Sequence, residues 1–471
     1  MKISYKNTII FTAISLLLSG TLCATAADYK RPKSQFLRYN EDWSSLKGVA
    51  REELLPQDKI KYVKLTEDGN AWVSFGGHIR ARQESHDNFA FGAPTNNNDD
   101  FFLYRGLFHA DFHFGESFRV FTEFKHADSS SRNLPGGNRN IDVDKTEIQQ
   151  FFVDYKIPLS QAGQSLTFRF GRQEYGFARN RLVSPLPWAN SLRHWDGFNI
   201  NYKTSNLDIT AFYSQFVPVK QDRSNRPDAD NLLHGVYITQ TLSASKGFDY
   251  YWLGTDRENR AFNGTFGDES RETFGLRHWG KFNDEWSYEF ETAYQTGSVG
   301  SEDVSAFMLA SEFTYKPKNV NLSPKLTLGY DYASGDDKVG GEVNTFNQLF
   351  PLGHAYFGFI DIIGRQNIID YSGSISIKPA KKVGLRLAIH ILQRAERADA
   401  LYNAGGGVVR AGNVNASKDV GTELDLTLSY KLSKRTGLSF GLSRLNAGDF
   451  LSDTGSDEDI NFAYAQFLFN F

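Results

Sequence analysis

The chain has 471 residues, one cysteine and a net charge of -3, from 52 basic and 55 acidic side chains. This near balance excludes the basic field of a nucleic-acid-binding protein and the long acidic tract of a disordered one. Mean hydropathy is -0.44 and no internal apolar run reaches about 18 residues, which excludes a polytopic helical membrane protein. A membrane β-barrel is not excluded, because its strands alternate apolar and polar residues and average out as hydrophilic.

The N-terminus carries the pattern of an export signal. An apolar run at 9–22 follows two lysines and leads into a stretch of small residues, which predicts a cleaved signal peptide over 1–26. Leu22 precedes the single cysteine and is not the small residue that a lipoprotein cleavage site requires, so we expect no lipid anchor. The mature chain then lacks cysteine, which favours Gram-negative export over a disulfide-rich extracellular domain.

The rest of the chain changes character near residue 70. Residues 27–70 are polar and charged without a sustained period, and we expect a periplasmic N-terminal segment there. From Trp72 onward apolar and polar residues alternate to the last residue. In 101–114, for example, the parity of Phe108 is apolar and the parity of Arg105 is polar. One face suits lipid and the other suits water, which predicts an outer-membrane barrel over 71–471.

The segments that connect the expected strands alternate in length along the chain. Short turns are expected at 115–116, 158–165, 203–206, 242–247, 282–285, 316–322, 378–381 and 432–435. Long polar segments rich in Gly, Asn and Asp lie between them, at 85–99, 126–145, 255–269, 335–364 and 395–420. The fold class that we predict is all-β, a transmembrane antiparallel β-barrel of about 18 strands with short periplasmic turns and long extracellular loops.

The last strand ends on an aromatic residue. Phe467, Phe469 and Phe471 share one parity of the stretch 460–471, so they give the closing strand an apolar, lipid-facing edge. We therefore expect two partners for the barrel: outer-membrane lipid, and the barrel-assembly machinery acting through the strand that ends at Phe471.

Four stretches resemble one family. They are QFLRY at 35–39, FRFGRQE at 168–174, NQLFPLGHAY at 347–356 and GTELDLTLSY at 421–430. Together they resemble the alginate export family of outer-membrane β-barrels, over nearly all of the mature chain. The resemblance implies an 18-strand barrel in the outer membrane of a Gram-negative bacterium and passage of a polymer or a solute.

The polar parity assigns a set of basic side chains to the lumen. Guanidinium groups suit carboxylate ligands, because they offer two parallel donors and stay charged. We expect Arg80, Arg82 and Arg105 to form one positive patch. The predicted pore-lining residues that contact the substrate are Arg80, Arg82, Arg105, Arg119, Lys125, Arg169, Arg172, Arg193, Arg386 and Arg394.

Two features leave alternatives for this lining. The same parity places acids inside, so individual arginines either bind ligand or pair with wall acids such as Glu84, Asp111 and Glu123. Strict parity points Arg172 at lipid, and we expect a bulge at Gly171 to turn it to the pore mouth. The following loop, 175–193, either folds inward as a constriction or caps the barrel.

The function that we predict is a passive, water-filled channel for anionic polysaccharide or oligosaccharide, alginate-like, without cofactor, metal or catalysis. A general or small-solute porin of the same fold is the main alternative. A barrel hydrolase is the third, because His109 and Asp111 share a face and form half of a hydrolase arrangement. The sequence contains no GxSxG, HExxH or zinc-type spacing that would complete such a site.

Overall fold

The computed structural model describes residues 29, 31–130, 132–160 and 163–471, and the predicted signal peptide lies outside them. The described residues divide into two compact units, one that ends at Ser74 and one that begins at Phe75. In the first unit, three 3-10 turns span Arg38–Asn40, Ser44–Leu46 and Pro56–Asp58, and the short strand β1 spans Val63–Lys64. A small apolar core holds this unit together and consists of Trp43, Leu46, Leu54, Tyr62 and Trp72.

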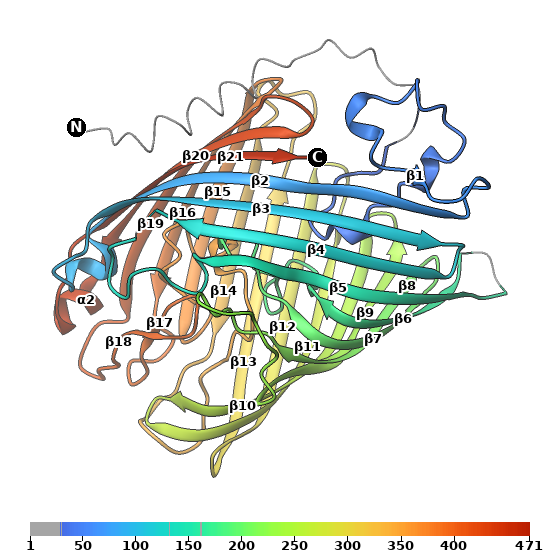
Figure 1. The fold of residues 1–471 in the computed structure, drawn as a ribbon. Helices are drawn as coiled ribbons and strands as arrows, with labels where there is room; N and C mark the ends of the chain where they lie inside the picture. Colours follow the sequence, from blue (N-terminus) through green and yellow to red (C-terminus); the bar gives the residue numbers. More distant parts are fainter. Residues whose placement is uncertain (1–28, 30, 131, 161–162) are drawn as a thin grey trace. The chain divides into compact units, whose positions relative to one another are not determined.

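The second unit is built almost entirely of long strands (Figure 1). Their bounds are β2 Ala71–Asp87, β3 Asp99–Phe114, β4 Phe118–Ser129, β5 Asp144–Pro158, β6 Ser165–Gln173, β7 Trp195–Lys203, β8 Leu207–Phe216, β9 Asn231–Ser243, β10 Lys246–Phe262, β11 Thr265–Lys281, β12 Trp286–Val299, β13 Glu302–Tyr315, β14 Lys325–Ala333, β15 Ile368–Ala380, β16 Val383–Gln393, β19 Asp419–Lys431, β20 Thr436–Ala447 and β21 Ile460–Asn470.

The remaining elements lie in the connections. They are the small ribbon of β17 Leu401–Tyr402 with β18 Val408–Arg410, the helix α2 Asp449–Thr454, and 3-10 turns at Phe89–Gly92 and Gly353–Ala355. No helix among the described residues is long and apolar enough to cross a membrane.

The sheet closes on itself. Consecutive strands pair antiparallel, and the last strand returns to the first, with Ile79 of β2 opposite Phe469 of β21. Gly77 and Phe471 exchange two backbone hydrogen bonds of 3.1 and 3.0 Å at this seam. The described residues therefore form a closed antiparallel barrel of 18 strands, which confirms the predicted fold class.

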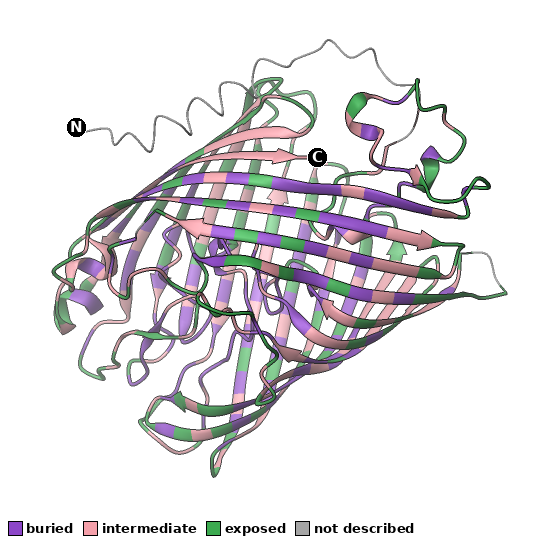
Figure 2. Ribbon diagram, viewed as in Figure 1, coloured by how far each residue is buried: buried purple, intermediate pink, exposed green. Residues whose placement is uncertain are grey.

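Side chains alternate between the two faces of the barrel wall, visible as alternating burial colours along the strands in Figure 2. Outward positions are apolar and exposed, such as Phe108 at 46% and Phe170 at 72%. Inward neighbours such as Arg105 and His109 are buried, with only 3% of their surface exposed. The outer face is thus an apolar belt and the inner face is polar, as the sequence parity predicts.

The short turns lie at the expected positions, at one end of the barrel. At the other end one expectation is wrong, because 255–269 is not a polar loop. Instead β10 and β11 continue until Phe262 pairs with Thr265 around an Asn263-Gly264 turn with positive φ at both residues. A two-residue turn of this kind matches the right-handed twist of the two strands. Burial of Phe262 with Val299, Val304 and Val343 stabilises the end of the extended hairpin.

The closing seam yields a testable prediction. Deleting Phe471 removes both hydrogen bonds to Gly77 and the ring that stacks on Phe469 at a centroid distance of 6.0 Å. We expect a clear loss of assembled protein in outer membranes, measured as the fraction of heat-modifiable, folded barrel. Phe471→Tyr keeps the backbone bonds and serves as the control. Equal assembly of the deletion and the intact chain would contradict the prediction.

Candidate functional site

Residues 174–194, the connection between β6 and β7, fold into the lumen. Arg80 of β2 donates to the backbone carbonyls of Trp188 at 2.8 Å and Ala189 at 2.9 Å. Arg105 of β3 donates to the same Ala189 carbonyl at 2.7 Å. Both guanidinium groups are almost completely buried, so charged donors fix one side of the loop to the β2–β3 wall.

The same loop is fixed to the opposite side of the ring by charges of its own. Arg181 contacts Glu289 at 2.5 Å and Glu291 at 2.8 Å, both on β12, and its side chain is 1% exposed. Arg179 reaches Glu289 at 3.3 Å and Glu312 of β13 at 3.2 Å. Basic wall residues bind the carbonyls of the loop, and acidic wall residues bind its arginines.

A second connection, 334–367, between β14 and β15, lies against the first. Val183 and Phe350 form a parallel bridge, and the Trp188 ring stacks on His354 with centroids 3.6 Å apart. The Ile360 amide donates to Glu423 of β19 at 2.9 Å, and Arg365 forms an ion pair with Asp331. The two connections together narrow the lumen, so of the two alternatives for 175–193 the structure has the inward fold.

The positive patch expected from Arg80, Arg82 and Arg105 is not open to the lumen. Arg82 donates to the Trp188 carbonyl at 2.8 Å, and its guanidinium carbon lies 3.7 Å from the centroid of the Trp188 ring. Arg82 also pairs with Glu84 at 2.6 Å. The backbone of the loop therefore covers all three guanidinium groups. They hold the constriction in place, and the expectation of an accessible patch is wrong.

The other predicted residues separate by partner. Arg119 forms a bidentate ion pair with Asp111 on the wall, and Arg169 forms one with Asp154. The two hydrogen bonds of each pair measure 2.7 and 2.8 Å. Lys125 pairs with Asp144 of β5 at 2.7 Å and donates to Ser191 of the first connection at 2.8 Å. Arg193 donates to the Pro351 carbonyl of the second connection at 2.8 Å, and Arg394 donates to the carbonyls of Arg397 and Ser417, between β16 and β19, at 2.8 Å each. Most of the predicted lining is thus structural.

Arg172 requires a correction. The register of β6 runs without a shift from Ser165 to Arg172 against β5 and from Ser165 to Gln173 against β7, so the bulge expected at Gly171 does not form. Arg172 lies directly opposite Phe151, which is 51% exposed on the outer face. It is held there by Asp196 at 2.8 Å and Glu147 at 3.5 Å. Pairing with acids at the long-loop end makes the outward position tolerable for a charge.

Cations without an ion pair gather at the short-turn end of the lumen. Arg386 of β16 and Lys325 of β14 face inward, since their strand neighbours Leu387 and Leu326 are exposed outside at 49% and 44%. Neither forms an ion pair within the described part of the chain. Lys325 was missed in the sequence, although it shares the parity of the inward Thr327.

The hydrolase alternative finds no support in the arrangement of its residues. Asp111 accepts both prongs of Arg119, while His109 lies 3.7 Å from Glu123. Across the described ranges, no group of three or more His, Cys, Asp or Glu side chains is placed to hold a metal ion.

One carboxyl on the second connection gives the constriction a pH dependence. Burial raises the pKa of Asp361 to about 7, opposed by Arg139, and Oδ1 is buried without a hydrogen-bond partner. The docked connection favours the protonated acid. The contribution of Asp361 to the stability of the docked connection is therefore fully present below the ordinary pKa of an aspartate. It is lost as the pH rises toward 7.

Two other groups of 334–367 also titrate: burial raises the pKa of Asp336 to about 6, and burial lowers the pKa of His354, which acts in the opposite direction. The Asp361→Asn variant isolates the contribution of Asp361. Relative to this variant, we expect 334–367 of the native chain to be cleaved progressively faster by protease as the pH rises from 5 to 8, after correction for the activity of the protease. A variant with the slope of the native chain would contradict the assignment to Asp361.

Comparison with known proteins identifies the family. The family model described as alginate export matches residues 71–465. The chain belongs to the alginate export family. Both the family and the barrel fold place it in the Gram-negative outer membrane and indicate a channel. The resemblance stated from the sequence is confirmed. A comparison with curated proteins found no match.

Solved outer-membrane barrels share the fold at low sequence identity. OccAB2 of Acinetobacter baumannii is 13% identical with a TM-score of 0.56, over 84% of this chain and 98% of that one. OccK11 (OpdR) of Pseudomonas aeruginosa is 12% identical with a TM-score of 0.54, over 87% and 98%. The outer membrane protein OprD of Pseudomonas aeruginosa is 10% identical with a TM-score of 0.53, over 84% and 94%. These similarities concern the barrel itself.

Proposed function

We propose that the barrel is a passive channel for anionic polysaccharide or its oligosaccharides, alginate-like, and that it performs no catalysis. The observation that carries the proposal is the pair of cations without ion pairs among the described residues at the short-turn end of the lumen, Lys325 and Arg386. We call these two residues the vestibule cluster.

Strand register supports the geometry of this cluster. Lys325 lies opposite Ser376 of β15, and Ser376 lies opposite Arg386, so the three side chains form one inward row. Arg179 approaches from the first connection and is 45% exposed. Lys325 is within electrostatic range of Arg179, Arg386 and Glu312. Arg179 is already paired with Glu289 and Glu312, so Lys325 and Arg386 are the two cations of this region that face the water of the lumen without an ion pair among the described residues.

A surface of this kind suits a chain of carboxylates. Fixed wall charge raises the local concentration of counter-ions in a narrow lumen. Guanidinium and ammonium donors bind carboxylates strongly enough for entry, and solvent screening keeps each contact weak enough for release. Ser376 between the two cations adds a hydroxyl that can bond a sugar.

A small-solute porin of the same fold is the second candidate. The observation that favours it is the pair of connections, 174–194 and 334–367, that cross the lumen above the vestibule cluster. A narrowed passage suits short solutes better than a long polymer, unless the connections move.

The test replaces Lys325 and Arg386 by Gln in the full chain reconstituted in planar bilayers. We expect the double variant to lose anion preference and to bind uronate oligomers several-fold less, measured as block of the ion current from the short-turn side. Lys318→Gln, an exposed turn lysine that pairs with Asp284, is the control. Neutral oligosaccharides of equal length should be unaffected. Unchanged uronate block with intact folding would leave the small-solute porin as the better description.

A further inference from the structure

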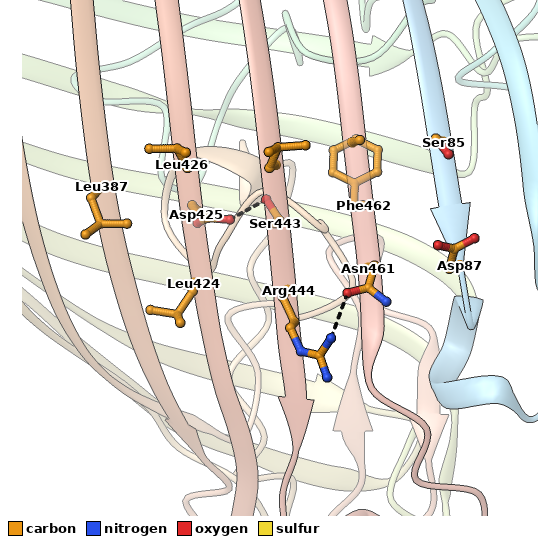
Figure 3. A pocket seen from close by; sticks show the side chains of 12 residues that line it. Ser85, Asp87, Leu387, Leu424, Asp425, Leu426, Ser443, Arg444, Asn461 and Phe462 are labelled. Carbon is orange, nitrogen blue, oxygen red and sulfur yellow. Dashed lines mark hydrogen bonds between the residues drawn. The ribbon is translucent and has the colours of Figure 1, made fainter.

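The outer face of the barrel carries a groove at the seam where the sheet closes (Figure 3). It has a volume of about 300 Å³ and lies over β16, β19, β20, β21 and β2. Its apolar wall is formed by Leu387, Leu424, Leu426 and Leu442, and its polar end by Asp87, Arg444 and Asn461. We refer to it as the seam groove.

Strand register explains the groove. One outward row runs Leu387, Leu426, Leu442, Ala463 and Ser85 across the five strands, because each residue lies opposite the next. The size of the side chain decreases from leucine on β20 to alanine on β21 and serine on β2. Since neighbouring strands lie about 4.8 Å apart, two short side chains in succession leave a trough beside the tall Leu442.

The next row toward the long loops is polar. Arg444 lies opposite Asn461, and Asn461 lies opposite Asp87. Arg444 is 54% exposed and donates to Asn446 at 2.9 Å, Asn461 at 3.3 Å and Asp459 at 2.6 Å. A guanidinium has five N–H donors, so two remain for a ligand. The carboxylate of Asp87 accepts a hydrogen bond from no described residue.

We propose that the seam groove binds an acyl chain of a phosphorylated glycolipid of the outer leaflet. The apolar trough faces the hydrocarbon of the membrane, and its polar end lies on the long-loop side, where the head groups of the outer leaflet are. The polar end offers the two free donors of Arg444, whose charge Asp459 partly balances, to an oxygen of an anionic group, and offers the Asp87 carboxylate to hydroxyl or amide donors. A phosphorylated amino sugar supplies both. The side chains at the seam thus form a single site for the acyl chain and the head group of the lipid.

The experiment uses full-length protein purified from its own outer membrane in mild detergent. Bound lipid is identified by native mass spectrometry and by the hydroxy fatty acids released on hydrolysis. Ala463→Leu fills the trough with a side chain that the lipid face accepts. Ala211→Leu is the matched control, because Ala211 is an outward alanine of β8, opposite Ile200, on the far side of the ring. Heat-modifiable mobility verifies folding of every variant.

We expect the native chain and Ala211→Leu to retain the glycolipid, and Ala463→Leu to lose most of it. Arg444→Gln should weaken retention several-fold while leaving ion conductance unchanged. If Ala463→Leu does not fold, Ser85→Leu fills the trough from the other strand and decides the question. Equal retention by the Ala463 and Ala211 variants would mean ordinary surrounding lipid and would overturn the proposal. Retention of a glycerophospholipid in place of the glycolipid would overturn it as well.

Discussion

Replacing Arg80 and Arg105 by Ala should raise single-channel conductance several-fold, because both guanidinium groups bind the backbone of 174–194 to the wall. Each lost charge-assisted hydrogen bond is worth about 1.5–3 kcal/mol, and both donors are nearly completely buried. The released connection should also become sensitive to protease. Conductance in planar bilayers and the site of limited proteolysis are the two measurements.

A matched arginine separates this effect from general damage to the barrel. Arg410 also donates to backbone carbonyls, at 3.3 Å to Leu451 and 2.8 Å to Ser456, but these belong to the segment around α2 at the outer rim. Arg410→Ala should therefore leave conductance unchanged. If the double variant assembles normally and conducts like the native channel, 174–194 does not narrow the ion path.

The second large effect is expected at the opposite attachment of the same connection. Arg181→Met leaves Glu289 and Glu291 with less compensation in a buried site, and breaking a buried ion pair in this way costs about 3–5 kcal/mol. We expect the docked connection to melt at a lower temperature than in the native chain. The readouts are the fluorescence of Trp188 and the protease resistance of 174–194.

Removing the acid along with the arginine tests the cause. Arg181→Met combined with Glu291→Gln deletes one of the two charges that the single change leaves behind, so it should recover a large part of the lost stability. Tyr251 still donates to the side chain at position 291, through the hydrogen bond that measures 3.0 Å in the native chain. A double variant as unstable as the single one would show that shape, rather than charge, holds Arg181 in place.

The barrel itself could be predicted because lipid imposes a period of two on every strand that crosses it. Phe108 beside Arg105 carries that signal, and so does Leu326 beside Thr327. The signal fails in 255–269, because this part of β10 and β11 carries charged residues on both faces, such as Asp256 and Arg257, and the period of two is lost. The Asn263-Gly264 pair was the cue for a tight hairpin.

The site was harder to predict, because parity gives the face of a residue but not its partner. Arg80 faces inward as expected, yet it binds Trp188, which is 108 positions away along the chain. No local pattern reports such a contact. Lys325 lies at the first position of its strand, where the turn obscures the parity. Arg172 kept the outward parity because acids that are distant in sequence neutralise it, so no bulge was needed.

The two-sided attachment of 174–194 has a consequence for the order of assembly. Arg80 belongs to the first strand of the barrel, and Glu289 belongs to a strand on the far side of the ring. The segment has both partners only after the wall has curved far enough to bring them to their final separation. Contacts between such distant parts of a chain form late, since the entropy of closing long loops opposes them. The nascent barrel is therefore wider inside than the mature one, and narrowing of the passage is a late step of folding.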